Sequence, residues 1–162
     1  MGQKFELKLS NPTIFFLSFF GTGFSPKAPG TVGTIATLPF LYYLGRYNIP
    51  FFLFIPFLII ITSITCFITD YTQKKLNLHD PQWIVIDESL GMFTAWLFSQ
   101  QHSLTHLCVL FFLFRIFDIF KVWPATFFDK KVKHGSGTIL DDIASGIYAG
   151  ISYLILLSLL NF

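Results

Sequence analysis

Two long apolar segments, residues 50–69 and 143–160, constrain the fold of this chain more than any other feature. Neither contains a charged side chain, and as helices rising about 1.5 Å per residue both approach the ~30 Å thickness of a membrane's hydrocarbon core. The chain is 53% hydrophobic and only 12% charged over 162 residues, which is too apolar for a soluble domain of this size. The sequence therefore predicts an integral membrane protein.

Shorter apolar segments complete a predicted all-α bundle. Residues 13–24 are also apolar, but about twelve residues cannot cross the hydrocarbon core, so we expect a short interfacial or re-entrant helix there. No linker, repeat or low-complexity tract interrupts the chain, so residues 1–162 are predicted to form a single membrane-embedded domain. Five main helices are expected, over residues 31–45, 50–69, 87–99, 104–120 and 143–160.

The basic residues predict how this bundle is oriented. Lys and Arg are enriched in cytoplasmic loops, so the side of the membrane that receives most of them is expected to be cytoplasmic. The formal net charge of +2 is too small to indicate a nucleic-acid partner. We expect a multi-pass protein of the inner membrane, with Arg46 on the outer side and, on the cytoplasmic side, Lys4, Lys8, Lys27, Lys74, Lys75, Lys121, Lys130, Lys131 and Lys133.

One apolar segment acquires charge at its end, where Arg115, Asp118 and Lys121 follow one another at intervals of three. On a helix this spacing places them within a face of roughly 120°. An ionisable side chain inside a membrane costs about 2.5 to 3.5 kcal/mol, so it needs a partner, a water-filled cavity or a function. Either Arg115 and Asp118 simply neutralise each other, or this face belongs to a functional site.

Two further acidic pairs are predicted on the same side of the membrane. Asp87 and Glu88 open the helix expected to end near residue 99, where capping explains one carboxylate but not two. Asp141 and Asp142 differ by about 100° around a helix. We therefore expect one of them to complete a capping box with Thr138 while the other faces the site.

Glycines are placed where close approach is useful. Residues 21–34 contain four glycines, two prolines and Lys27, so this loop could present backbone N–H groups to an anion, or it could be only a turn before a helix. It is not a P-loop, because the spacing of that motif is absent. Gly91 leaves room for another backbone or a ligand, and the Gly146/Gly150 spacing predicts close helix packing.

These residue types favour one chemistry. Clustered carboxylates with few histidines suit Mg²⁺, which binds a few carboxylates together with water and substrate phosphate. Lysines, an arginine and a glycine-rich loop suit a phosphorylated substrate, and the membrane boundary suits a lipid headgroup. A Mg²⁺-dependent enzyme acting on a phospholipid phosphate is therefore predicted. The alternative is a small channel or transporter subunit, which would need polar groups through the whole membrane depth.

Three blocks of the sequence also resemble one family. GTGFSPKAPGTVGT, HDPQWIVIDESLGM and FRIFDIFKVWPATFFDKKVKHGSGTILDDIASG occur in the order found in the membrane phosphatidylglycerophosphatase A family, and the resemblance extends from about residue 13 to 150. It implies an all-helical, Mg²⁺-requiring enzyme of phospholipid biosynthesis. Such an enzyme hydrolyses the terminal phosphate of phosphatidylglycerophosphate to give phosphatidylglycerol. Val122 stands where the family's Lys-Pro pattern is expected to have proline, which would let the preceding helix run slightly further.

The chemistry of the residues and the family resemblance together predict roles for the charged residues. We expect Mg²⁺ to be held by Glu88, Asp118, Asp141 and Asp142, with Asp87 and Asp129 as second choices. A metal-activated water would attack the phosphorus in line, and a carboxylate or His134 would accept its proton. A phospho-aspartate intermediate is an open alternative to direct attack by water. The oligomeric state is also left open. The phosphoryl oxygens are expected to be bound by Lys27, Arg115 and Lys121.

Overall fold

The computed structural model describes residues 8–47, 51–78, 80–99, 103–132 and 135–160, and over these residues it confirms the all-α prediction. Side chains are not described for residues 51, 129 and 130. The described part of the chain contains no strand. Its elements are α1 (Pro12–Leu17), the 3₁₀ helix η1 (Thr22–Phe24), α2 (Pro29–Arg46), α3 (Phe51–Leu76), α4 (Ile86–Trp96), α5 (Leu104–Phe120), α6 (Ala125–Lys131) and α7 (Gly135–Leu160).

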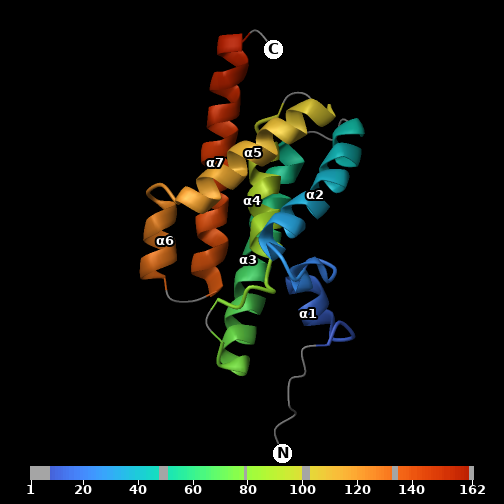
Figure 1. Cartoon of the computed structure of the whole chain (residues 1–162), viewed down its shortest axis with the longest axis vertical. Coiled ribbons are helices and arrows are strands. Elements are labelled where there is room, and N and C mark those ends of the chain that lie inside the picture. Colours follow the sequence, from blue (N-terminus) through green and yellow to red (C-terminus); the bar gives the residue numbers. More distant parts are fainter. Residues whose placement is uncertain (1–7, 48–50, 79, 100–102, 133–134, 161–162) are drawn as a thin grey trace, which may run out of the picture.

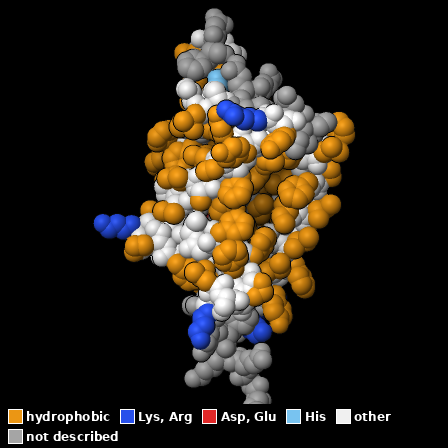
Figure 2. All heavy atoms as spheres, turned by 90° about the vertical axis from the view of Figure 1, so that its right-hand side faces the viewer, with side chains coloured by type: hydrophobic (Ala, Val, Ile, Leu, Met, Phe, Trp, Pro, Cys, Tyr) orange, Lys and Arg blue, Asp and Glu red, His pale blue; other side chains and the backbone are white. Residues whose placement is uncertain are grey.

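Two described helices, α3 and α7, are long and apolar enough to cross a membrane, over Phe52–Leu76 and Gly135–Leu160. They run in opposite directions, α3 towards the lower end of Figure 1 and α7 towards the upper end. The face turned towards the viewer in Figure 2 is mostly apolar, with basic side chains near its ends and one projecting from its left edge, and no acidic side chain in view. This surface suits a hydrocarbon environment and supports a membrane protein.

The short helix α4 forms the centre of the bundle (Figure 1). It contacts α2, α3, α5 and α7, and nine of its eleven residues are buried. Its apolar core partners include Leu41 from α2, Leu110 and Phe114 from α5, and Tyr153 from α7. Because α4 is enclosed on several sides, its first turn is held firmly relative to α7 and α5.

Glycines set the distance between α4 and α7. A Cβ atom built on Gly146 would lie 2.2 Å from the carbonyl oxygen of Gly91, and one on Gly91 would lie 2.7 Å from the carbonyl oxygen of Asp142. Gly150 is packed equally tightly against the ring of Phe98. The predicted close packing at Gly91, Gly146 and Gly150 is thus confirmed, and the partner of α7 is α4.

Several predicted boundaries are wrong because polar residues extend the helices. Helix α2 begins at Pro29, so the last part of the glycine-rich segment 21–34 is helical. Helix α3 continues to Leu76, which places Lys74 and Lys75 in its last turn. The apolar segment 13–24 is divided between α1 and η1, and α6 was not predicted at all.

The start of α7 is the largest correction. The charge-free span was expected over residues 143–160 with Thr138 as the cap of its helix, but the helix begins at Gly135, before Thr138, and contains both aspartates. The Thr138 hydroxyl donates to the carbonyl of Gly135 within the helix, so the capping box predicted with Asp141 is not formed. Instead, Asp70 of α3 accepts a hydrogen bond of 2.9 Å from the backbone N–H of Ser136. A carboxylate from another helix therefore caps α7.

Candidate active site

A polar cavity of about 440 Å³ opens where the starts of α2 and α4 meet the end of α5 and the second turn of α7. Four residues that precede α4 complete its wall: Asp80, Pro81, Gln82 and Ile84. Six carboxylates and two basic side chains line it: Asp80, Asp87, Glu88, Asp118, Asp141, Asp142, Arg115 and Lys121. The three charged blocks that the sequence analysis singled out are thus brought into one cavity.

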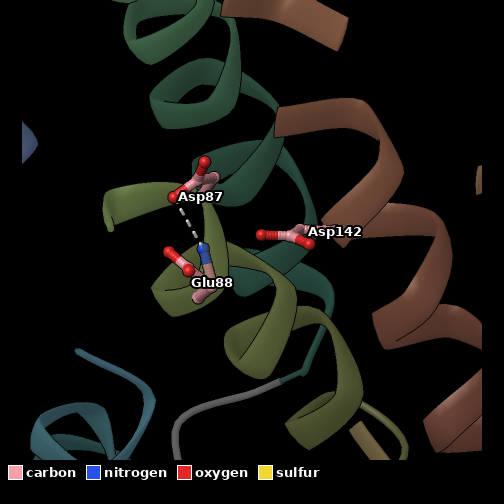
Figure 3. Close-up of side chains that lie close together, drawn as sticks. All are labelled: Asp87, Glu88 and Asp142. Carbon is pink, nitrogen blue, oxygen red and sulfur yellow. Dashed lines mark hydrogen bonds between the residues drawn. The ribbon is translucent and has the colours of Figure 1, made fainter. Parts of the chain in front are cut away.

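Three of these carboxylates form a cluster suited to a metal ion. Asp87, Glu88 and Asp142 each present an oxygen within 4.8 Å of the others (Figure 3). The first two lie in the first turn of α4 and the third lies on α7, across the interface that Gly91 and Gly146 hold close. The Glu88 backbone N–H also donates to Asp87 Oδ1 at 3.1 Å, which orients that carboxylate.

Burial makes this cluster costly without a cation. Asp87 and Asp142 are each about 5% exposed, and Glu88 Oε2 is buried with no hydrogen-bond partner among the described residues. Burial raises the pKa of Asp87; burial and then the neighbouring Asp87 and Asp118 charges raise the pKa of Glu88 well above its ordinary value. A divalent cation would offset this repulsion and give Glu88 Oε2 a partner, so the oxygen donors present fit Mg²⁺.

Arg115 and Asp118 form an ion pair along α5, with Nη1 and Oδ2 2.5 Å apart. The alternative that these two residues neutralise each other therefore describes their contact correctly. Both side chains nevertheless line the cavity and are less than one-fifth exposed. Asp118 lies outside the cluster of three, so its expected role as a metal ligand stays a prediction.

Lys121 reaches the cavity by another route than predicted. Helix α5 ends at Phe120, and Lys121 adopts a left-handed conformation with φ of 37°, so it does not continue the face of Arg115 and Asp118. The helix is thus not extended by Val122. From this position Lys121 Nζ lies 2.6 Å from Oδ2 of Asp141 on α7. Asp141 is paired with this lysine and does not cap the helix, its expected role as a metal ligand stays a prediction, and Asp142 belongs to the cluster of three.

Of the remaining predicted residues, only Lys27 has a described side chain. Lys27 is exposed and is not among the cavity-lining residues, although its neighbours in the first turn of α2 are. Asp129 lies on α6 with its side chain outside the described residues, and His134 lies outside them entirely. Their expected roles stay predictions.

Sequence reasoning missed how directly Gly30 contributes. A Cβ atom there would lie 2.0 Å from Glu88 Oε1 and 3.6 Å from Arg115 Nη1, so the missing side chain leaves room for both charged groups. The glycine-rich composition of the loop was a signal, but it pointed to the whole segment and not to this position. Asp80 and Thr138 also line the cavity, and neither was predicted to be a site residue.

Comparisons with known proteins indicate one family. The family model described as phosphatidylglycerophosphatase A matches residues 15–157. A protein of that name from Escherichia coli (strain K12) is 36% identical over 153 residues, covering 94% of this chain and 88% of its own. Another, from Haemophilus influenzae, is 33% identical over 147 residues, covering 90% and 89%. No solved structure matches significantly.

The match covers every element that builds the cavity, from α2 to the cluster residue on α7. The alignments with the two relatives cover at least 90% of this chain and at least 88% of each relative. The chain belongs to the phosphatidylglycerophosphatase A family.

Proposed function

We propose that this protein is a Mg²⁺-dependent lipid phosphatase that hydrolyses the terminal phosphomonoester of phosphatidylglycerophosphate, giving phosphatidylglycerol and phosphate. The observation that carries the proposal is the buried cluster of Asp87, Glu88 and Asp142, which lies in the same cavity as Arg115 and Lys121. Carboxylates that hold a cation beside basic groups that receive an anion are the arrangement that phosphoryl transfer requires. The names of the two relatives support the lipid substrate.

The metal-binding residues in this proposal are Asp87, Glu88 and Asp142, and Asp118 and Asp141, which line the same cavity, would bind or orient further ligands. Bound Mg²⁺ would polarise a phosphoryl oxygen and lower the pKa of a bound water. The protein's own contribution is a fixed set of oxygens, since the α4–α7 contact holds them before substrate arrives. A carboxylate of the cavity or His134 would accept the proton of the attacking water.

The two ion pairs have a separate role in the proposal. Asp118 holds Arg115 and Asp141 holds Lys121, so both cations stay in the cavity before a phosphate is present. When the phosphomonoester enters, its oxygens offer these cations additional acceptors, and charge developing on the phosphoryl group is offset. The guanidinium of Arg115 can bind two oxygens at once, which orients the group for in-line attack.

We infer that the protein is a multi-pass inner-membrane protein of about five main helices with the cavity facing the cytoplasm. The apolar spans of α3 and α7 support membrane insertion. Lys74 and Lys75 end α3 at the lower end of Figure 1, whereas Arg46 ends α2 at the upper end, which supports a cytoplasmic lower end. Helix α4, about 16 Å long, lies within the bundle and does not cross it alone.

The alternative of a channel or transporter subunit receives no support from the core. Between the cavity and the far end of the bundle, the buried cluster around Met92, Leu107 and Phe114 is mostly apolar, and its Tyr153 hydroxyl is hydrogen-bonded to His106. An ion path would need polar groups at that depth.

The proposal is tested by phosphate release from phosphatidylglycerophosphate by the purified protein in detergent, with Mg²⁺ and with EDTA, beside phosphatidic acid as a competing substrate. Release should require Mg²⁺ and favour phosphatidylglycerophosphate. Asp142→Asn and Glu88→Gln should lower turnover at least about a hundredfold without preventing folding. Asp70→Asn, the same change outside the cavity, keeps an acceptor oxygen for Ser136 and should be active. No release from folded protein, or near-normal rates for both cluster variants, would refute the proposal.

A further inference from the structure

A second cavity, of about 540 Å³, lies beside α2 and the start of α5, and its lining differs from that of the first. Its lining is apolar and aromatic, and the face of the molecule that carries α2 is turned towards the viewer in Figure 2. We call this cavity the α2 groove; it is lined by Ile35, Leu38, Pro39, Tyr42, Tyr43 and Leu104.

The α2 groove continues the wall of the catalytic cavity. Thr31 lines the catalytic cavity, and Ile35, Leu38 and Tyr42 follow it at intervals of four, three and four residues, which is one face of a helix. A single stripe of α2 therefore runs from the charged cavity into the apolar groove.

The second wall shows the same continuity. Leu104 at the start of α5 lines the groove, and Arg115, eleven residues later and thus about three turns along the same face, lines the catalytic cavity. The two helices are close at the cavity end as well, since a Cβ atom on Gly30 of α2 would lie 3.6 Å from Arg115 Nη1. Helices α2 and α5 thus form walls of both cavities.

We propose that the α2 groove binds a fatty acyl chain of the same phospholipid whose phosphate enters the catalytic cavity. This inference rests on the proposed function and adds the site for the apolar part of the substrate. A phospholipid has a charged headgroup joined directly to apolar chains, and the two cavities, polar and apolar, follow one another along α2 in the same way.

The dimensions fit a chain from one leaflet. Along α2, Thr31 and Tyr42 are separated by about 16 Å, and half of the hydrocarbon core is about 15 Å thick. At the far end of the groove Arg46 Nη2 donates to the Tyr42 hydroxyl at 2.6 Å, and its guanidinium lies over the Tyr42 ring. Tyr42, which lines the groove, is thus held by the residue that ends α2.

The groove acts by orienting the lipid. An acyl chain is surrounded by hydrocarbon whether it lies in the bilayer or in the groove, so transfer contributes little. A chain held along α2 fixes the direction from which the headgroup approaches the cluster, and correct orientation of a reacting group accelerates its reaction.

Photo-crosslinking tests the location directly and does not require turnover. Phosphatidylglycerophosphate with a photoreactive group midway along one chain should label peptides containing residues 31–46 and Leu104, and unlabelled phosphatidylglycerophosphate should compete. Photoreactive phosphatidylcholine, which lacks the phosphomonoester, is the control. Labelling spread evenly over the exposed faces of α3 and α7, or equal labelling by both lipids, would overturn the inference.

A matched pair of variants tests the effect on selectivity. Ile35→Trp fills the groove, whereas Ile59→Trp makes the same change on α3, where the isoleucine is similarly exposed but does not line the groove. Ile35→Trp should lower kcat/KM for a long-chain substrate relative to a short-chain, water-soluble analogue by about tenfold, because a displaced chain no longer orients the headgroup towards the cluster. Ile59→Trp should leave this ratio as in the unaltered protein.

The outcomes separate this inference from the proposed function. If the unaltered protein releases phosphate from both substrates but Ile35→Trp does not change their ratio, the groove is not an acyl-chain site and the phosphatase proposal stands. If the unaltered protein releases phosphate from neither substrate, the phosphatase proposal fails. A change in oligomeric state in Ile35→Trp with an unchanged ratio would show that the groove binds a second copy and would overturn the inference.

Discussion

Replacing Gly146 with alanine should separate the two halves of the metal cluster. The added Cβ atom would lie 2.2 Å from the Gly91 carbonyl oxygen, whereas real Cβ contacts are essentially never shorter than 3.0 Å. Backbone cannot yield as a flexible side chain does, so α7 must move away from α4 by about 1 Å, carrying Asp142 away from Asp87 and Glu88.

The magnitude follows from the two consequences of that movement. Overpacking a tight contact costs about 1 to 3 kcal/mol, although alanine alone would favour the helix by about 1 kcal/mol over glycine. A net loss of stability would therefore originate in the helix contact. A misplacement of about 1 Å can lower turnover about a hundredfold, and we expect a decrease of that order together with weaker Mg²⁺ dependence.

The measurement is kcat and the Mg²⁺ concentration for half-maximal activity, with thermal unfolding in the same detergent. Ile147→Ala is the control, because the neighbouring side chain is exposed and lies on another face of α7. Gly146→Ala with unaltered kcat and Mg²⁺ response would refute the reasoning that the α4–α7 distance sets the cluster geometry.

Three further predictions concern charge. Lys121→Gln should leave Asp141 without its partner and raise KM about tenfold, with a smaller change in kcat; equal KM values in a substrate titration would contradict this. Because the pKa values of Asp87 and Glu88 are raised, the metal-free folded protein binds more protons than the unfolded chain above about pH 4. Its melting temperature in EDTA should therefore fall as pH rises, and Mg²⁺ should reverse the fall; a pH-independent melting temperature in EDTA would be the contrary result. Asp70→Ala should remove the cap of α7 and destabilise the protein by about 1 kcal/mol, which chemical denaturation would detect, with Asp70→Asn as the milder control.

The sequence predicted helices well where apolar residues extend over most of the helix. The span of α5 was predicted at its observed bounds, Leu104–Phe120, and the apolar parts of α3 and α7 were identified. Predicted helix ends were wrong where charged residues continue a helix, because charged residues are typical of loops unless their interaction partners are known. Asp141 lies inside α7 with Lys121 beside it, and that contact joins residues from two different elements.

The residues of the candidate site were predicted, but of its two ion pairs only Arg115–Asp118, within one helix, was among the alternatives. Asp87, Glu88 and Asp142 were all expected near a metal, and they do lie together. Asp118 and Asp141 were given the same role, which stays a prediction, and each contacts a basic side chain, Arg115 or Lys121. Spacing along a helix indicates which residues share a face; it does not indicate which charges from other helices face them.

The enclosure of α4 also sets an order of events during synthesis. Nine of its eleven residues are buried, and the helix that covers much of this surface, α7, follows it by about forty residues in the chain. At the ribosome, the segment bearing Asp87 and Glu88 emerges long before the helix bearing Asp142. Until α7 inserts, α4 lacks its main neighbour and is too short to span the bilayer alone. The cluster can therefore assemble only after α7, the last described helix, has been synthesised.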